Sequence, residues 1–98
     1  MNDIKKMSGW FVDSSIDRMK NAVEFATLTI LPKGTRRASD FAVKSIREAF
    51  EQANGALMFN LVYAEAITEE EQAELYHKLY EAKLYWEDRA LEIGGYAA

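Results

Sequence analysis

Apolar residues recur with the period of an α-helix over residues 68–93, and they form two stripes instead of one. At about 100° per residue, one narrow sector of this helix holds Leu75, Leu79, Ala82, Trp86, Ala90 and Ile93. A second sector beside it holds Ala73, Tyr76, Tyr80, Leu84 and Leu91. Because one neighbouring helix cannot cover both sectors, we expect the helix to lie in the middle of a bundle, or to pack on its own subunit with the first stripe and on another chain with the second.

Two earlier helices are predicted over residues 8–30 and 36–62. In the first, a single stripe recurs at spacings of three and four and consists of Val12, Ile16, Met19, Val23, Ala26 and Ile30. Pro32 and Gly34 mark a break over residues 31–35. Thr35 or Ser39 is expected to cap the second helix, and residues 1–7 are expected to fray.

The second helix is predicted to have an inner face of small residues, which lets a neighbouring helix approach closely. This face is lined by Ala42, Ile46, Ala49, Ala53, Ala56, Leu57, Asn60 and Ala64. Phe41 and Phe59 lie on the opposite side, where something should cover them, and Gly55 is interpreted as a point of close contact or a mild kink. The third helix begins with a Thr68-x-x-Glu71 capping box and ends at Gly94.

These patterns predict one all-α domain over residues 1–98, a small bundle of three main helices completed by oligomerisation. Its expected core consists of Ile16, Met19, Val23, Ile46, Ala49, Ala53, Leu75, Leu79 and Trp86. No apolar run approaches the roughly 20 residues that span a bilayer, and no secretory signal is evident, so we expect a cytoplasmic protein. The absence of cysteine excludes disulfides, cysteine-based zinc sites and thiol catalysis.

Charge is distributed unevenly along the chain. Residues 1–50 carry nine Lys/Arg against six Asp/Glu, whereas residues 51–98 carry three against ten. The acidic second half argues against nucleic acid wrapping the whole surface. A local basic corner at the start of the second helix could still bind phosphate or an acidic protein surface; it consists of Lys33, Arg36, Arg37 and Lys44. Alternatively, i, i+4 pairs such as Asp40 with Lys44 make this a solvated face.

No catalytic motif stands out, and we expect a protein without enzymatic activity, cofactor or metal. His77 has acids at positions 74 and 81, which resembles half of a metal site, but an exposed histidine is the better interpretation. The acids from Glu69 to Glu74 are better explained by capping than by acid–base chemistry. Tyr85 points into the polar arc and should be exposed. The expected protein interface consists of Tyr76, Tyr80, Leu84, Tyr85 and Leu91.

The run from Leu31 to Arg36, Leu-Pro-Lys-Gly-Thr-Arg, is followed by Val43-Lys44 and an alanine-rich helix. This pattern resembles the small four-helix-bundle family that includes the accessory variability determinant of diversity-generating retroelements and proteins encoded in intervening sequences of ribosomal RNA. The resemblance implies a non-enzymatic bundle, pentameric in some members, that binds a reverse transcriptase and nucleic acid. This chain differs in being a helix shorter, and in being acidic where the retroelement members are basic.

Residues 25–59 also resemble a small phage-encoded anti-CRISPR inhibitor of type II-C systems. The matching residues are Phe25, Ala26, Leu28, Leu31, Pro32, Lys33, Arg36, Lys44, Ser45, Glu48, Phe50 and Ala53. The resemblance implies a compact helical protein that blocks a Cas protein by occupying its surface. We therefore expect a non-enzymatic phage or mobile-element inhibitor that docks on a bacterial nucleoprotein machine and forms a homo-oligomer. The alternative is an accessory bundle subunit that binds nucleic acid or a reverse transcriptase through the basic corner.

Overall fold

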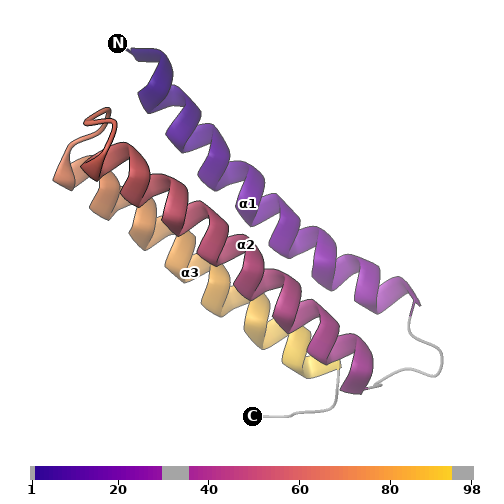
Figure 1. Cartoon of the computed structure of the whole chain (residues 1–98). Helices are drawn as coiled ribbons and strands as arrows, with labels where there is room; N and C mark the ends of the chain where they lie inside the picture. The colour runs from indigo at the N-terminus through magenta and orange to yellow at the C-terminus, as the bar shows by residue number, and fades with distance from the viewer. Residues whose placement is uncertain (1, 30–35, 94–98) are drawn as a thin grey trace.

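The computed structural model describes the backbone of residues 2–29 and 36–93 and the side chains of residues 6–28 and 38–93. These residues form three helices, α1 (Asn2–Thr29), α2 (Arg36–Val62) and α3 (Glu69–Ile93), and no strand (Figure 1). The chain is therefore an all-α bundle, as predicted. None of the three helices is both long and apolar enough to cross a membrane.

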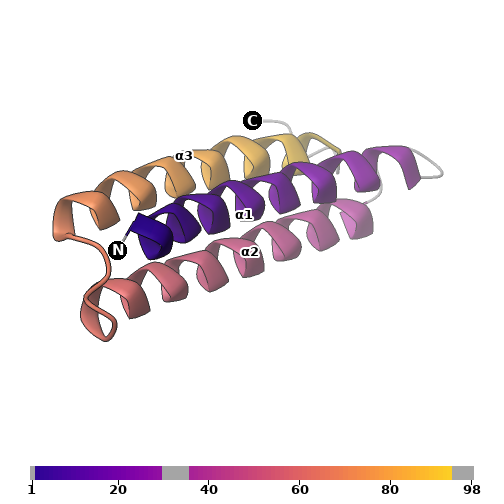
Figure 2. The ribbon, with the colours of Figure 1, turned by 90° about the horizontal axis from the view of Figure 1, so that it is seen from above.

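The helices alternate in direction and each packs against the other two. Seen from above, α1 lies over the groove between α2 and α3 (Figure 2). The start of α1 therefore lies beside the end of α2, and the end of α3 lies beside the start of α2 (Figure 1). The bundle is long and thin, with extents of 50 × 22 × 15 Å.

The core runs along the whole bundle and confirms the predicted stripes. Six of the nine expected core residues are buried, namely Met19, Val23, Ile46, Ala49, Ala53 and Leu79, and the other three, Ile16, Leu75 and Trp86, pack against them. The α2 contribution is dominated by alanine, which brings its neighbours close. Ile67, in the short connection between α2 and α3, is also buried, and the sequence pattern gave no sign of this.

Helix α1 is longer than predicted, because it begins at Asn2 and not near Ser8. A tertiary contact holds the helix at Ser8. The Ser8 side chain is buried, and its Oγ accepts a hydrogen bond of 2.8 Å from Asn60 Nδ2 near the end of α2. The predicted break at residues 31–35 lies outside the described residues, as does Ile30 of the first stripe.

Local signals at the helix ends met different outcomes. The capping box is confirmed, since the Glu71 backbone N–H donates to Thr68 Oγ1 at 3.1 Å and the Thr68 N–H donates to the Glu71 carboxylate at 2.9 Å. Ser39 is not a cap, because it lies inside α2 with its side chain fully buried. Gly55 makes no close contact, since a Cβ atom there would meet nothing within 4 Å.

Candidate protein-binding surfaces

Four of the predicted interface residues form one strip on α3. We name Tyr76, Tyr80, Leu84 and Leu91 the tyrosine strip; their exposed fractions lie between 36% and 45%. The two tyrosine rings stack at 6.0 Å, and Phe50 of α2 meets them edge-on at 5.9 and 6.1 Å. Phe50 therefore supports one edge of the strip from within the chain and leaves its outer surface exposed.

A cluster of charged side chains lies between the tyrosine strip and α2. Glu87 is buried, and its carboxylate accepts hydrogen bonds of 3.1 Å from Arg47 Nε of α2 and from Lys83 Nζ one turn earlier. The Lys83 ammonium also lies 5.4 Å from the centre of the Phe50 ring. Glu87 therefore joins α2 and α3 through Arg47 and is paired with Lys83 within the same helix.

Tyr85 is exposed as predicted, but it does not belong to the tyrosine strip. Its ring lies edge-on against Trp86 at 4.7 Å, and the Arg89 guanidinium stacks 4.8 Å from the ring centre. Arg89 also donates a hydrogen bond of 3.0 Å to the Tyr85 hydroxyl, which raises the pKa of the arginine above its ordinary value. This group therefore forms a separate small cluster on α3.

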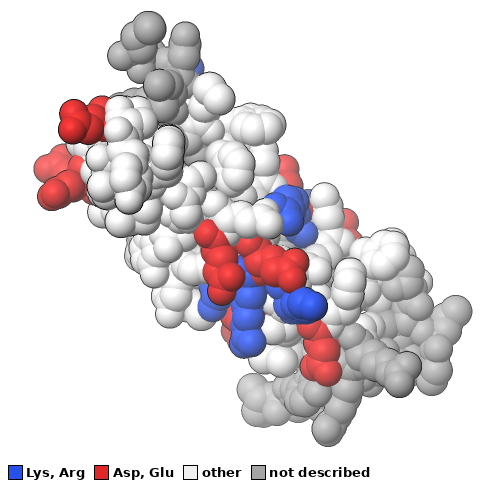
Figure 3. Space-filling model, in the orientation of Figure 1, with Lys and Arg blue, Asp and Glu red and all other residues white. Residues whose placement is uncertain are grey.

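Of the predicted basic corner, only the Lys44 side chain lies among the described residues. Lys33 lies outside the described residues, as do the side chains of Arg36 and Arg37. Lys44 is exposed and borders a shallow hollow of about 560 Å³ between α2 and the end of α3. The hollow is lined by Asp40, Val43, Lys44, Arg47, Glu48, Glu51 and Leu91. Acidic and basic side chains mix on this face (Figure 3), so the hollow does not concentrate positive charge.

The candidate metal and acid–base residues lie on the surface. His77 is exposed, and its Nε2 lies 3.0 Å from the carboxylate of Glu81, which is also exposed. Glu69 and Glu70 are exposed at the start of α3, where they suit the positive end of the helix dipole. Within residues 6–28 and 38–93, no group of histidines and acids has the arrangement of a metal site.

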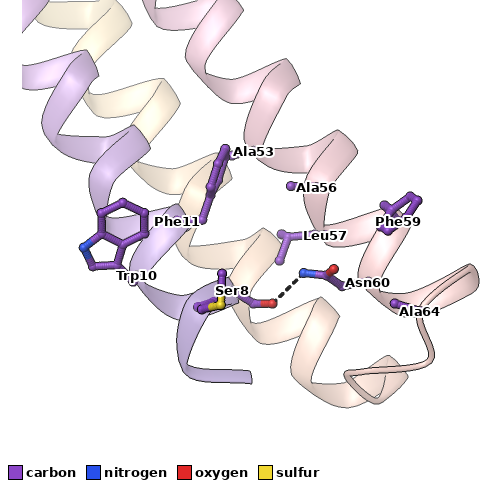
Figure 4. Close-up of a pocket in the computed structure, with 10 residues that line it drawn as sticks. Ser8, Trp10, Phe11, Ala53, Ala56, Leu57, Phe59, Asn60 and Ala64 are labelled. Carbon is purple, nitrogen blue, oxygen red and sulfur yellow. Dashed lines mark hydrogen bonds between the residues drawn. The ribbon is translucent and has the colours of Figure 1, made fainter. Parts of the chain in front are cut away.

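An apolar pocket between α1 and α2 was not predicted from the sequence. It has a volume of about 310 Å³ and opens where the start of α1 passes the end of α2 (Figure 4). Its lining consists of Met7, Ser8, Trp10, Phe11, Ala53, Ala56, Leu57, Phe59, Asn60 and Ala64, with no charged side chain among them. The one sequence signal for it was Phe59. The Tyr63 ring lies 5.6 Å from that of Phe59 and covers part of it, yet Phe59, like Phe41, stays more than half exposed.

Comparison with protein families, with curated proteins and with solved structures finds no match for this chain.

Proposed function

We propose that this chain is a non-enzymatic protein-binding protein that docks on a partner through the tyrosine strip. The observation that carries the proposal is a line of large apolar side chains left exposed on a helix whose other stripe is buried in the core. From Tyr76 to Leu91 the strip runs about 22 Å at 1.5 Å per residue. Tyrosines that are held rigidly and partly buried are frequent anchors of protein interfaces.

Charges beside the strip indicate what kind of partner surface fits. Along the adjacent part of α2, the basic residues Lys44 and Arg47 are followed by the acidic residues Glu48 and Glu51. A partner with an apolar centre and a rim carrying both signs of charge would match this arrangement, whereas a uniformly charged nucleic-acid backbone would meet repulsion from the acids.

The partner class follows from the resemblance to type II-C anti-CRISPR inhibitors. We propose that the chain is a phage or mobile-element protein that acts in the bacterial cytoplasm. There it would occupy a protein surface of an RNA-guided nuclease and so block DNA cleavage. This role needs contact surface and no reaction centre.

Cleavage of a target DNA by a purified type II-C effector tests this proposal. Wild-type protein should inhibit cleavage, and Tyr80→Glu should lose at least about tenfold in inhibition, because a charge at the centre of an apolar contact is costly. Tyr85→Glu is the matched control, since it places the same charge on the same helix outside the strip, and it should inhibit like the wild type. Absence of inhibition and of complex formation across type II-C effectors would overturn the assignment to this partner.

The alternative, a nucleic-acid-binding subunit, has a separate readout. A mobility shift of RNA or DNA at about 50 mM salt that weakens steeply with added salt would indicate phosphate contacts. If replacing Lys33, Arg36 and Arg37 with alanine abolished that shift, the basic corner would displace the tyrosine strip as the functional site.

A further inference from the structure

A second face of the bundle, formed by α1 and α2, also exposes large apolar side chains among the described residues. Its α1 residues recur at alternating spacings of four and three; they are Met7, Phe11, Ser14, Arg18, Asn21, Phe25 and Leu28. Its α2 residues recur in the same way and are Phe41, Ser45, Glu48, Gln52, Gly55 and Phe59. We name these residues the α1–α2 face. Both rows carry large apolar side chains at their ends and polar ones in the middle.

The large apolar members are exposed. Met7, Phe25, Leu28, Phe41 and Phe59 each expose more than half of their surface, up to 82% for Leu28, and Phe11 exposes 36%. A single exposed apolar residue needs no explanation, but several that gather at each end of one face mark an interaction surface. In Figure 3, acidic and basic side chains mix near the middle of the visible face, uncharged surface lies between them and the upper-left end, and further acidic groups lie at that end.

Two hydrogen bonds fix how the rows on α1 and α2 align. Asn60 donates to Ser8 near one end, and Arg18 donates to Gln52 at 2.7 Å in the middle. Phe11 therefore lies level with Phe59, where both line the apolar pocket. By the same alignment, Phe25 lies near the level of Phe41 at the other end, so the face has two apolar ends joined by a polar centre.

We infer that this face binds a second copy of the same chain, with the two-fold axis parallel to the helices. In this arrangement α1 of each copy packs on α2 of its mate, and each apolar end meets its own equivalent. Arg18 of one copy then lies at the level of Gln52 of the other, one helical turn from Glu48, which the arginine side chain can reach, and the contact occurs twice by symmetry. A two-fold axis perpendicular to the helices would instead stack Arg18 on Arg18, which is repulsive.

The size of the face suits a stable dimer. On α1 the face runs from Met7 to Leu28 and is therefore about 32 Å long at 1.5 Å per residue. Two helices side by side are about 20 Å wide, which gives roughly 600 Å² per copy, or about 1,200 Å² in all, the lower end of the range for stable protein interfaces. The resulting contact would join α1 and α2 of both copies as a four-helix layer, and it would leave both tyrosine strips exposed.

Charge reversal at the centre of the α1–α2 face tests this inference. The masses of wild type, Arg18→Glu, Glu48→Arg and the double variant are measured by sedimentation velocity over a concentration series up to about 100 μM. The wild type should be a dimer. Each single variant should raise the dimer dissociation constant at least about tenfold, because it creates two repulsive contacts, and the double variant should recover to within about threefold of the wild type. Lys20→Glu, an equivalent reversal on α1 outside the face, should have no effect, and circular dichroism checks that all variants are folded.

Three outcomes would overturn the inference. A wild type that is monomeric at about 100 μM has no such interface. If Arg18→Glu lowers the dimer dissociation constant, the dimer has the perpendicular axis. If neither charge reversal changes the dissociation constant, the dimer forms through another surface. None of these outcomes depends on a CRISPR effector, so this test and that of the proposed function can fail separately.

Discussion

At the scale of single residues, Glu87 shows how the bundle accommodates a charge between two apolar stripes. A buried carboxylate is costly unless its oxygens are paired, and here one oxygen accepts from Arg47 and the other from Lys83. The two partners differ in exposure, since the Lys83 side chain is 20% exposed and that of Arg47 is 62% exposed. Solvent screens the Arg47 contact more, so we expect it to contribute little to stability while it fixes the alignment of α2 on α3.

Ser39 presents the opposite case, a buried polar atom without a partner. Its Oγ is buried and has no hydrogen-bond partner in the described part of the chain. Ser39→Ala should therefore raise the free energy of unfolding by about 1 kcal/mol, because it removes an unsatisfied hydroxyl and keeps the helix. Urea denaturation of the two proteins measures the difference, and a loss of stability would mean that the hydroxyl has a partner in the folded protein.

Leu79 is the side chain whose truncation should cost most among the predicted core residues of α3. It is fully buried among side chains from the other helices. Leu79→Ala should lower the free energy of unfolding by about 2–5 kcal/mol. Leu84→Ala, on the exposed strip of the same helix, is the control and should cost well under half as much in the same denaturant titration. Equal effects would contradict the assignment of the two stripes.

At the scale of elements, the three helices were predictable because each carries a long apolar stripe with a period of 3.6 residues. The start of α3 was also predictable, because its capping box involves only residues within one turn of each other. The start of α1 at Asn2 was placed too late from the sequence, and the contact between Ser8 and Asn60, 52 positions apart, could not be predicted from a local pattern. Ser39 was misjudged for a related reason. A serine near a helix start is chemically suited to capping, and only the packing of α2 shows that it points into the core.

The surfaces were predictable to different degrees. The tyrosine strip follows from the period of one helix, so its members and their exposure were accessible from the sequence. Its support by Phe50 was not, because that contact depends on how α2 and α3 align. The apolar pocket and the α1–α2 face were missed for the same reason: Phe11 and Phe59 belong to neither core stripe, and only the alignment of α1 with α2 brings them together.

Gly55 provides a test of packing within α2. A side chain at this position would meet no neighbouring atom within 4 Å, so the glycine serves no close approach inside the chain. Gly55→Ala should raise the melting temperature, in line with a gain of about 1 kcal/mol from helix propensity. Ala53→Gly at the buried face two positions earlier should lower it. A decrease on Gly55→Ala would indicate close packing at this position against the second copy that binds the α1–α2 face.

At the scale of the whole molecule, a thin three-helix bundle cannot bury every apolar side chain that its helices carry. A chain of 98 residues buries only about 60 to 65% of its unfolded surface, and the tyrosine strip and the α1–α2 face are two groups of apolar side chains left exposed here. We assign the α1–α2 face to a copy of the same chain and the strip to a different protein. Sequence reasoning had assigned self-association to the strip, which the structure shows to be supported in part by Phe50.

Sedimentation velocity of two single variants tests this division most directly. Each subunit has a mass of 11.2 kDa, so monomer and dimer are well separated. At about 100 μM, the account predicts that Phe59→Glu is a folded monomer, because the charge enters the apolar end of the α1–α2 face, and that Tyr80→Glu remains a dimer like the wild type. A monomeric Tyr80→Glu beside a dimeric Phe59→Glu would contradict the account and return self-association to the tyrosine strip.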